Sequence, residues 1–220
     1  MKAWIALSLI CCWLPLAQAL PVDGPVAARV NGVEISQMRL EHYFADYLKA
    51  EGRAVTSIRS PSVYGRLRSA ALDELVDKEL LWQEALRQGV VIEDSVVAAE
   101  IADLRQAFGS PETFSRRLAE AGFDEQSFAD YTRHEMAAQA VYAQLTRVEE
   151  PDVEQLKAFY AGEGSVLLSQ SNQTFEAMVS TEQGLAWLKT HYSNRQQMLA
   201  ARALLERLRA QGSIERIDAG

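Results

Sequence analysis

The chain has 220 residues, of which 48% are hydrophobic and 24% charged, and its formal net charge is −8. This length and composition suit one folded domain, alone or with a small appendage, and they exclude a disordered chain, a collagen and a protein with several membrane spans. The excess of 30 acidic over 22 basic residues argues against a nucleic-acid binder, because affinity for phosphates needs clustered positive charge.

The first nineteen residues have the pattern of a secretory signal peptide. Lys2 supplies a short positive region, residues 3–16 are mostly apolar, and Ala17 and Ala19 form an A-x-A cleavage site. We expect export to the periplasm with cleavage after Ala19, which leaves 201 residues without cysteine because both cysteines lie in the removed segment. A retained anchor is the alternative, and a lipoprotein signal fits less well because no small residue precedes either cysteine.

The start of the remaining chain predicts a β-hairpin followed by a helix. Alternating apolar residues in VAARV and VEIS flank Asn31-Gly32, a pair that favours the tight turn of a two-residue hairpin. Ser36 is placed to cap the next helix, whose apolar residues keep helical spacing until Gly52. A two-stranded hairpin is marginal alone, so it needs a further strand or a helix to pack against.

Helical periodicity continues through most of the chain. A long helix is predicted from about Ser62 to Gln88, ended by Gly89 in the position where a glycine commonly follows a helix. The helices predicted after it are, in chain order, one through Val97 and Phe108 that stops at Gly109, one from Ser110-Pro111 to Gly122, one capped by Asp124 and running to Leu145, a short one from Asp152, and a long one from Thr181 to Ala210.

The C-terminal part completes the predicted fold. Residues 163–180 have the least regular pattern, Gly184 weakens the start of the last helix, and residues 213–217 alternate like an edge strand. We therefore predict a mostly α fold: an elongated helical core whose short N-terminal hairpin is completed by the C-terminal strand. The predicted division is 1–19 as signal peptide, 20–161 as helical core, 162–180 as short irregular linker, and 181–220 as returning helix and strand.

Sequence motifs for catalysis or metal binding are missing. His42, His134 and His191 fall in three different predicted helices, and none has the spacing of a metal-ligand pair such as H-E-x-x-H. The sequence has no G-x-S-x-G elbow, no P-loop and no G-x-G-x-x-G segment. We therefore expect no metal, no cofactor and no catalytic residue, and apolar or aromatic surface that binds peptide segments becomes the candidate site.

The order of these elements resembles that of the periplasmic SurA/PrsA-type chaperones, whose core module is related to that of trigger factor. The resemblance extends over roughly residues 26–161 and 196–217 and depends on order and spacing, because no single motif is diagnostic. The segments that carry it are VAARVNGVEIS, ALDELVDKELLWQEALRQGVVIEDSVV, FDEQSFADYTRHEMAAQAVYAQL, EEPDVEQLKAFY and ARALLERLRAQGSIERI.

One departure from this family limits what the resemblance implies. Family members commonly carry parvulin-type prolyl isomerase domains between the lead-out helix and the returning helix. Residues 162–195 occupy that gap here, and they are shorter than a folded domain of about 50 residues or more and show no parvulin-like motif. The resemblance therefore implies a chaperone core whose isomerase domain is absent.

The resulting hypothesis is a periplasmic chaperone-like protein, concerned with outer membrane assembly, that binds unfolded or partly folded exported polypeptides in an apolar crevice without isomerase activity. Two alternatives stay open: a peptidyl-prolyl cis-trans isomerase family member with residual activity, and a dedicated assembly subunit with one envelope partner. No nucleic-acid partner and no stable membrane span after signal removal are expected. Candidate client contacts outside the regular helical stripes, for each of which a place in the core is the simpler interpretation, are Tyr64, Phe108, Met178 and Trp187.

Overall fold

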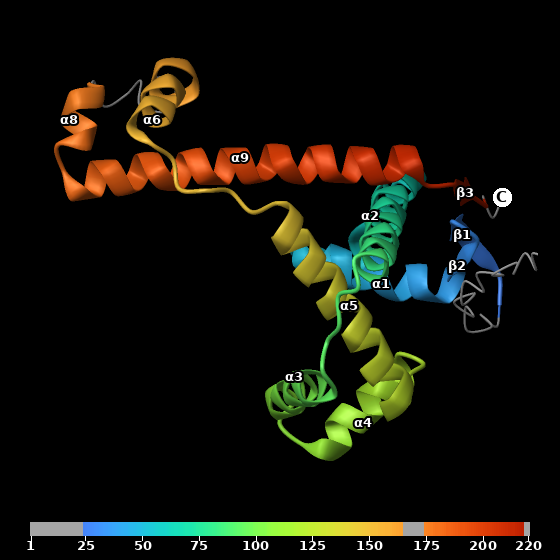
Figure 1. The fold of residues 1–220 in the computed structure, drawn as a ribbon. Helices are drawn as coiled ribbons and strands as arrows, with labels where there is room; N and C mark the ends of the chain where they lie inside the picture. The colour runs from blue at the N-terminus through green and yellow to red at the C-terminus, as the bar shows by residue number, and fades with distance from the viewer. Residues whose placement is uncertain (1–23, 165–173, 218–220) are drawn as a thin grey trace, which may run out of the picture.

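The structure, a computed structural model, describes residues 24–164 and 174–217, so the predicted cleavage site at Ala17 and Ala19 lies outside the described residues. Its helices form three groups spread along an elongated molecule (Figure 1), which we name the body, the arm and the tail lobe. The long helices α5 (Glu125–Leu145) and α9 (Glu182–Gln211) join these groups. The predicted fold class, a mostly α elongated core with a small sheet, is confirmed.

The body holds a three-stranded antiparallel sheet in the order β2-β1-β3. Strands β1 (Val26–Val30) and β2 (Val33–Ser36) form the predicted hairpin, and β3 (Ile214–Arg216) pairs with the other edge of β1. Asn31 and Gly32 adopt φ angles of 51° and 84°, the positive values that the tight turn requires. The C-terminal strand therefore completes the N-terminal hairpin, as predicted.

Helices α1 (Gln37–Ala50) and α2 (Pro61–Arg87) pack with the sheet in the body, and a short 3-10 turn, η1 (Val55–Ser57), lies between them. Ser36 caps α1 as predicted, because its side chain accepts a hydrogen bond from the Arg39 N–H. The largest buried cluster takes side chains from the sheet and from α1, α2 and α9, among them Val30, Ile35, Leu40, Phe44, Leu75, Val76 and Leu208.

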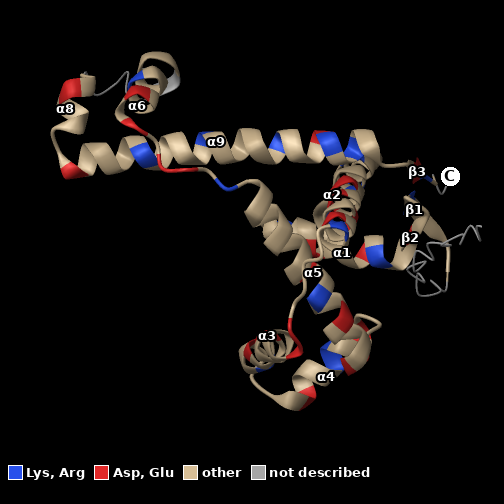
Figure 2. Ribbon diagram, viewed as in Figure 1, with Lys and Arg blue, Asp and Glu red and all other residues tan. Residues whose placement is uncertain are grey.

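Charged side chains hold the C-terminal end of α9 to α2. Arg209 donates hydrogen bonds of 2.6 and 2.9 Å to the two carboxylate oxygens of Asp77, and Arg216 pairs with Asp73. Figure 2 shows the acidic residues of α2 next to the end of α9 that carries these basic residues. A two-pronged arginine–carboxylate pair fixes orientation as well as distance, so the returning helix has a defined place on the body.

Asn31 ties the hairpin turn both to α2 and to the chain before β3. Its backbone N–H donates to the Ser213 carbonyl at 2.8 Å, its side-chain oxygen accepts from the Ser213 N–H at 2.7 Å, and its side-chain amide donates to Gln83 at 2.6 Å. Gln83 in turn donates to the Val30 carbonyl and to the buried Glu79 carboxylate. The turn residue therefore also holds the returning strand in register.

The arm consists of α3 (Asp94–Ala107), α4 (Pro111–Glu120) and the first half of α5. Ser110 and Asp124 cap α4 and α5 as their positions predict. A chain of aromatic rings runs through the arm, with neighbouring centroids 5.3 to 6.4 Å apart, from Phe108 through Phe114, Phe128, Phe123 and Tyr131. Aromatic edge contacts therefore supply much of its packing.

The tail lobe consists of α6 (Val153–Phe159), the π-helical turn η2 (Tyr160–Gly164), α8 (Phe175–Val179) and the start of α9. The predicted irregular linker over residues 162–180 is wrong at Phe175–Val179, which form the capped helix α8, and its residues 165–173 lie outside the described residues. Its apolar residues are spaced for a helix but too few to signal one, and Phe175 and Met178 are buried by side chains of both α6 and α9. The buried cluster of the lobe is Leu156, Phe175, Met178 and Leu188.

Gly184 has a packing role that its place in the sequence does not predict. A Cβ atom at this position would lie 2.2 Å from the Met178 carbonyl oxygen, well inside contact distance. The glycine therefore allows α8 to approach the first turn of α9, rather than only weakening that turn. In the described part of the chain, no helix combines the length and the apolar character needed to cross a membrane.

Candidate functional site

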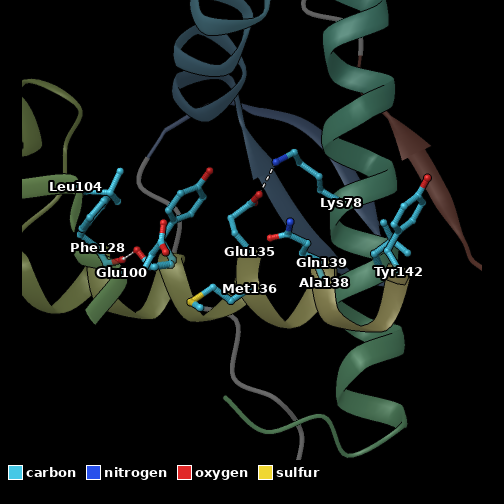
Figure 3. A pocket seen from close by; sticks show the side chains of 12 residues that line it. Lys78, Glu100, Leu104, Phe128, Glu135, Met136, Ala138, Gln139 and Tyr142 are labelled. Carbon is cyan, nitrogen blue, oxygen red and sulfur yellow. Dashed lines mark hydrogen bonds and ion pairs between the residues drawn. The ribbon is translucent and has the colours of Figure 1, made fainter. Parts of the chain in front are cut away.

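A pocket of about 460 Å³ lies between α2, α3 and α5, where the arm meets the body (Figure 3). We name it the α5 pocket, because most of its lining residues belong to that helix. It is lined by Lys78 and Leu81 of α2, by Glu100 and Leu104 of α3, and by Phe128, Tyr131, Thr132, Glu135, Met136, Ala138, Gln139 and Tyr142 of α5.

Helix α5 forms the long side of the pocket because its lining residues recur at helical spacing. Phe128, Tyr131, Glu135, Ala138 and Tyr142 are three or four positions apart and therefore share one face. The helix rises about 21 Å between the first and the last of them, at about 1.5 Å per residue. The pocket thus follows about four turns of α5, a length comparable to six residues of extended polypeptide.

Helix α3 covers this face of α5 only in part, as the small number of buried side chains on α3 shows. Val97 is its one buried residue, whereas Glu100 is exposed and Leu104 is half-buried. Its first turn forms an exposed ion pair of 2.6 Å between Asp94 and Arg133 of α5. The helix therefore contacts α5 near its start and borders the pocket further along.

The charged groups of the pocket are unevenly matched. Lys78 pairs with Glu135 and also lies over the ring of Tyr43, with its nitrogen 5.4 Å from the ring centroid. Glu100 has no hydrogen-bond or ion-pair partner within residues 24–164 and 174–217. The lining therefore carries one base that is already paired, one acid that is paired and one acid that is free.

Tyr131 adds a polar tip to the apolar wall. Burial, assisted by the nearby Glu135 carboxylate, raises the pKa of Tyr131 to about 12, so its phenol stays protonated at neutral pH. The Thr132 hydroxyl donates a hydrogen bond of 2.8 Å to the Phe128 carbonyl and is thereby occupied within the helix. The pocket lining thus combines apolar and aromatic side chains with the charged or polar groups of Lys78, Glu100, Thr132, Glu135 and Gln139, and its apolar part is suited to binding apolar side chains of a polypeptide.

The histidines near aromatic surface are stacked on tryptophan rings. The His134 ring lies 3.8 Å from that of Trp82, and the His191 ring lies 3.8 Å from that of Trp187. Within the part of the chain that the structure describes, no group of three or more His, Cys, Asp or Glu side chains is placed to hold a metal ion.

The residues predicted to contact clients fall in three separate places. Met178 and Trp187 come together in the tail lobe, where Met178 is 4% exposed and Trp187 packs half-buried against the same cluster. Tyr64 lies in the body, with its ring edge-on to Phe44 at 5.2 Å. Phe108 lies in the arm and is 44% exposed. The structure therefore does not unite these four residues in one site.

The lining residues of the α5 pocket were not among the predicted contacts. Phe128, Tyr131 and Tyr142 recur at helical spacing along α5, and Leu104 does so along α3, which is the pattern of residues that pack helices together. Their helical spacing is the same as that of fully buried residues, so no signal in the sequence separates them from the core.

Comparison with known proteins identifies relatives of the chain. The sequence profile of the SurA-like N-terminal domain matches residues 3–142. Among curated proteins no relative matches. One similar solved structure comes from Campylobacter jejuni, in which the virulence factor PEB4 and the periplasmic protein Cj1289 are described as two structurally related SurA-like chaperones. The two chains are 11% identical with a TM-score of 0.49, over 88% of this chain and 99% of that one.

Proposed function

The chain belongs to the SurA-like N-terminal domain family, and we propose that it is a periplasmic chaperone that binds unfolded or partly folded exported polypeptides, without isomerase activity. The observation that carries the proposal is the α5 pocket, an open pocket of about 460 Å³ between the arm and the body whose lining includes Leu104, Phe128 and Met136. Export through the predicted signal peptide, with cleavage after Ala19, brings the protein to clients on their way to the outer membrane.

The proposed mechanism is reversible capture. Apolar client side chains leave water and enter the α5 pocket, and each fully buried one contributes about 1.5–3 kcal/mol. Two or three such side chains, less the cost of ordering the client, correspond to affinities of roughly micromolar or weaker. Such binding delays aggregation and still releases the client without ATP.

The exposure of each predicted contact residue decides whether we include it in this proposal as a direct client contact. Phe108 in the arm, and Tyr64 and Trp187, which are half-buried, have surface that a client could contact. Met178 lies beneath the tail-lobe surface and would act by supporting Trp187. The proposed client path therefore includes the α5 pocket and secondary contacts on the arm, body and tail lobe.

The direct test is suppression of aggregation of an unfolded outer-membrane protein, measured by light scattering. We expect the exported protein to suppress aggregation and Met136→Gln to weaken the effect, because this change places an amide in the pocket wall. Met198→Gln is the matched control, since Met198 is 55% exposed on α9 and does not line the pocket. Equal suppression by both variants would remove the pocket from the proposal.

Two further measurements separate the proposal from its alternatives. In a proline-limited refolding assay we expect the protein to leave the slow phase unchanged, and acceleration would establish isomerase activity. Failure to suppress aggregation, combined with co-purification of one stable envelope protein, would favour a dedicated assembly subunit. N-terminal sequencing of the exported protein tests the predicted cleavage, with Leu20 as the expected first residue.

A further inference from the structure

We propose that the α5 pocket prefers client segments in which a basic residue stands next to the apolar side chains, with Glu100 as the group that pairs with that base. This inference rests on the proposed function and adds a charge preference to it. Two observations lead to it. The Glu100 carboxylate lies without a partner in the described ranges beside apolar lining residues of the pocket, and Lys78, the basic residue of the lining, is already paired with Glu135.

The position of Glu100 is set by α3. It lies one helical turn before Leu104, so both side chains are on the same face of α3, and both line the α5 pocket. In Figure 3 Glu100 is drawn with Phe128 and Leu104 toward one end of the pocket, and Lys78 with Tyr142 toward the other. A client that places an apolar side chain against Phe128 and Leu104 therefore brings its neighbouring residue to the Glu100 carboxylate.

Bases that could compete for Glu100 are already engaged. Lys78 pairs with Glu135 across the pocket. Arg105, the basic residue of α3, pairs with Glu125 at 3.5 Å, and Arg133 of α5 pairs with Asp94. The arm therefore offers a carboxylate, not a base, to an incoming segment.

A second acidic side chain lies close to Glu100 on α3, whereas the nearby Arg39 of α1 pairs with the buried Glu79 at 3.9 Å. Asp103, one turn along α3 from Glu100, is exposed and also has no partner in the described ranges, but it does not line the pocket. The whole chain has a net charge of −8. An acidic client segment would meet repulsion here, and a basic one would meet attraction that weakens as salt is added.

The size of the preference follows from the exposure of Glu100. An exposed ion pair changes affinity by roughly two- to five-fold, so we expect selection among client segments rather than tight binding. Apolar burial would still supply most of the affinity. The charge would decide which of several apolar stretches in one client occupies the pocket.

The experiment uses three fluorescein-labelled peptides with the same Leu-Phe-Leu centre, flanked on both sides by Lys, by Gln or by Glu. Fluorescence anisotropy gives Kd for the exported protein, for Glu100→Gln and for the control Asp103→Asn, at 50 mM and 500 mM salt. We expect the Lys-flanked peptide to bind about two- to five-fold more tightly than the Gln-flanked one, and the Glu-flanked peptide to bind most weakly. Glu100→Gln should abolish the difference, and Asp103→Asn should preserve it.

The outcomes separate this inference from the function on which it rests. Equal Kd values for the three peptides, or an equal loss of preference in both variants, overturn the role of Glu100. If the Gln-flanked peptide still binds and Met136→Gln weakens it, the proposed function survives that result. If no peptide binds, both proposals fail. Circular dichroism of each variant shows that the fold is retained, which these exposed positions on α3 permit.

Discussion

The body and the arm differ in how they bury apolar side chains. The body closes its sheet with a returning strand and buries one large cluster, and it adds hydrogen bonds at Asn31 and an ion pair at Arg209. The arm is built on a chain of aromatic contacts, and its helix α3 buries a single residue, Val97. The largest buried cluster therefore lies in the body, whereas the accessible apolar surface of the α5 pocket lies where the arm meets the body.

The largest effect should come from a cavity in the body. Phe44→Ala removes a ring that is 1% exposed and packs edge-on against Tyr64, and it should lower the free energy of unfolding by about 3–5 kcal/mol. Phe108→Ala, at a ring 44% exposed in the arm, should cost about 1 kcal/mol or less. Urea denaturation measures both, and equal losses would show that the arm is as tightly packed as the body.

The tail lobe offers the next test, because its packing depends on one glycine. Gly184→Ala would bring a Cβ atom against the Met178 carbonyl, which backbone movement must relieve at a cost of about 1–3 kcal/mol. Hydrogen exchange should speed up in α8 and the first turns of α9, while α1 and α2 keep their protection. Loss of protection throughout the molecule would mean that the lobe and the body unfold together.

The closure of the sheet can be weakened without altering the turn. Asn31→Gly allows the positive φ of the turn but removes the side-chain hydrogen bonds to Ser213 and Gln83, and it should cost about 1–2 kcal/mol. The Ser213 amide should lose exchange protection more than the amides between β1 and β2. An unchanged Ser213 amide would contradict the role given to Asn31.

The smallest expected effect is a pH dependence at the junction of arm and body. Desolvation, with the nearby Arg39 charge, lowers the pKa of His134, so folding favours its neutral form. Its contribution to stability is present above the ordinary pKa of about 6.5 and is lost as the pH falls through the lower folded-state pKa. His134→Gln should therefore flatten the decline in stability between pH 7 and pH 5, and an identical decline in the variant would refute this assignment.

Local features were predictable from the sequence because each depends on a few neighbouring residues. The caps at Ser36, Ser110 and Asp124 and the turn at Asn31-Gly32 need only a side chain and the backbone beside it. The pairing of the last strand with the hairpin was also predicted, because a lone hairpin needs a third partner.

The α5 pocket and α8 were not predictable in the same way. The stripe through Phe128 and Tyr142 has the same spacing whether a neighbouring helix covers it or not, so periodicity alone reports a core. Helix α8 is short, and its burial at Phe175 depends on α9, which follows it in the chain. Both features are set by tertiary packing, to which local sequence patterns are insensitive.

The pairing of β1 with β3 also sets an order in time. Arg29 and Glu215, which are neighbours across these strands, are 186 positions apart in the chain. A polypeptide that emerges from its N-terminus onward cannot complete the body until nearly the whole chain has been delivered, whereas α3, α4 and α5 (residues 94–145) can meet one another much earlier. The helices that line the α5 pocket can therefore fold before the body is complete.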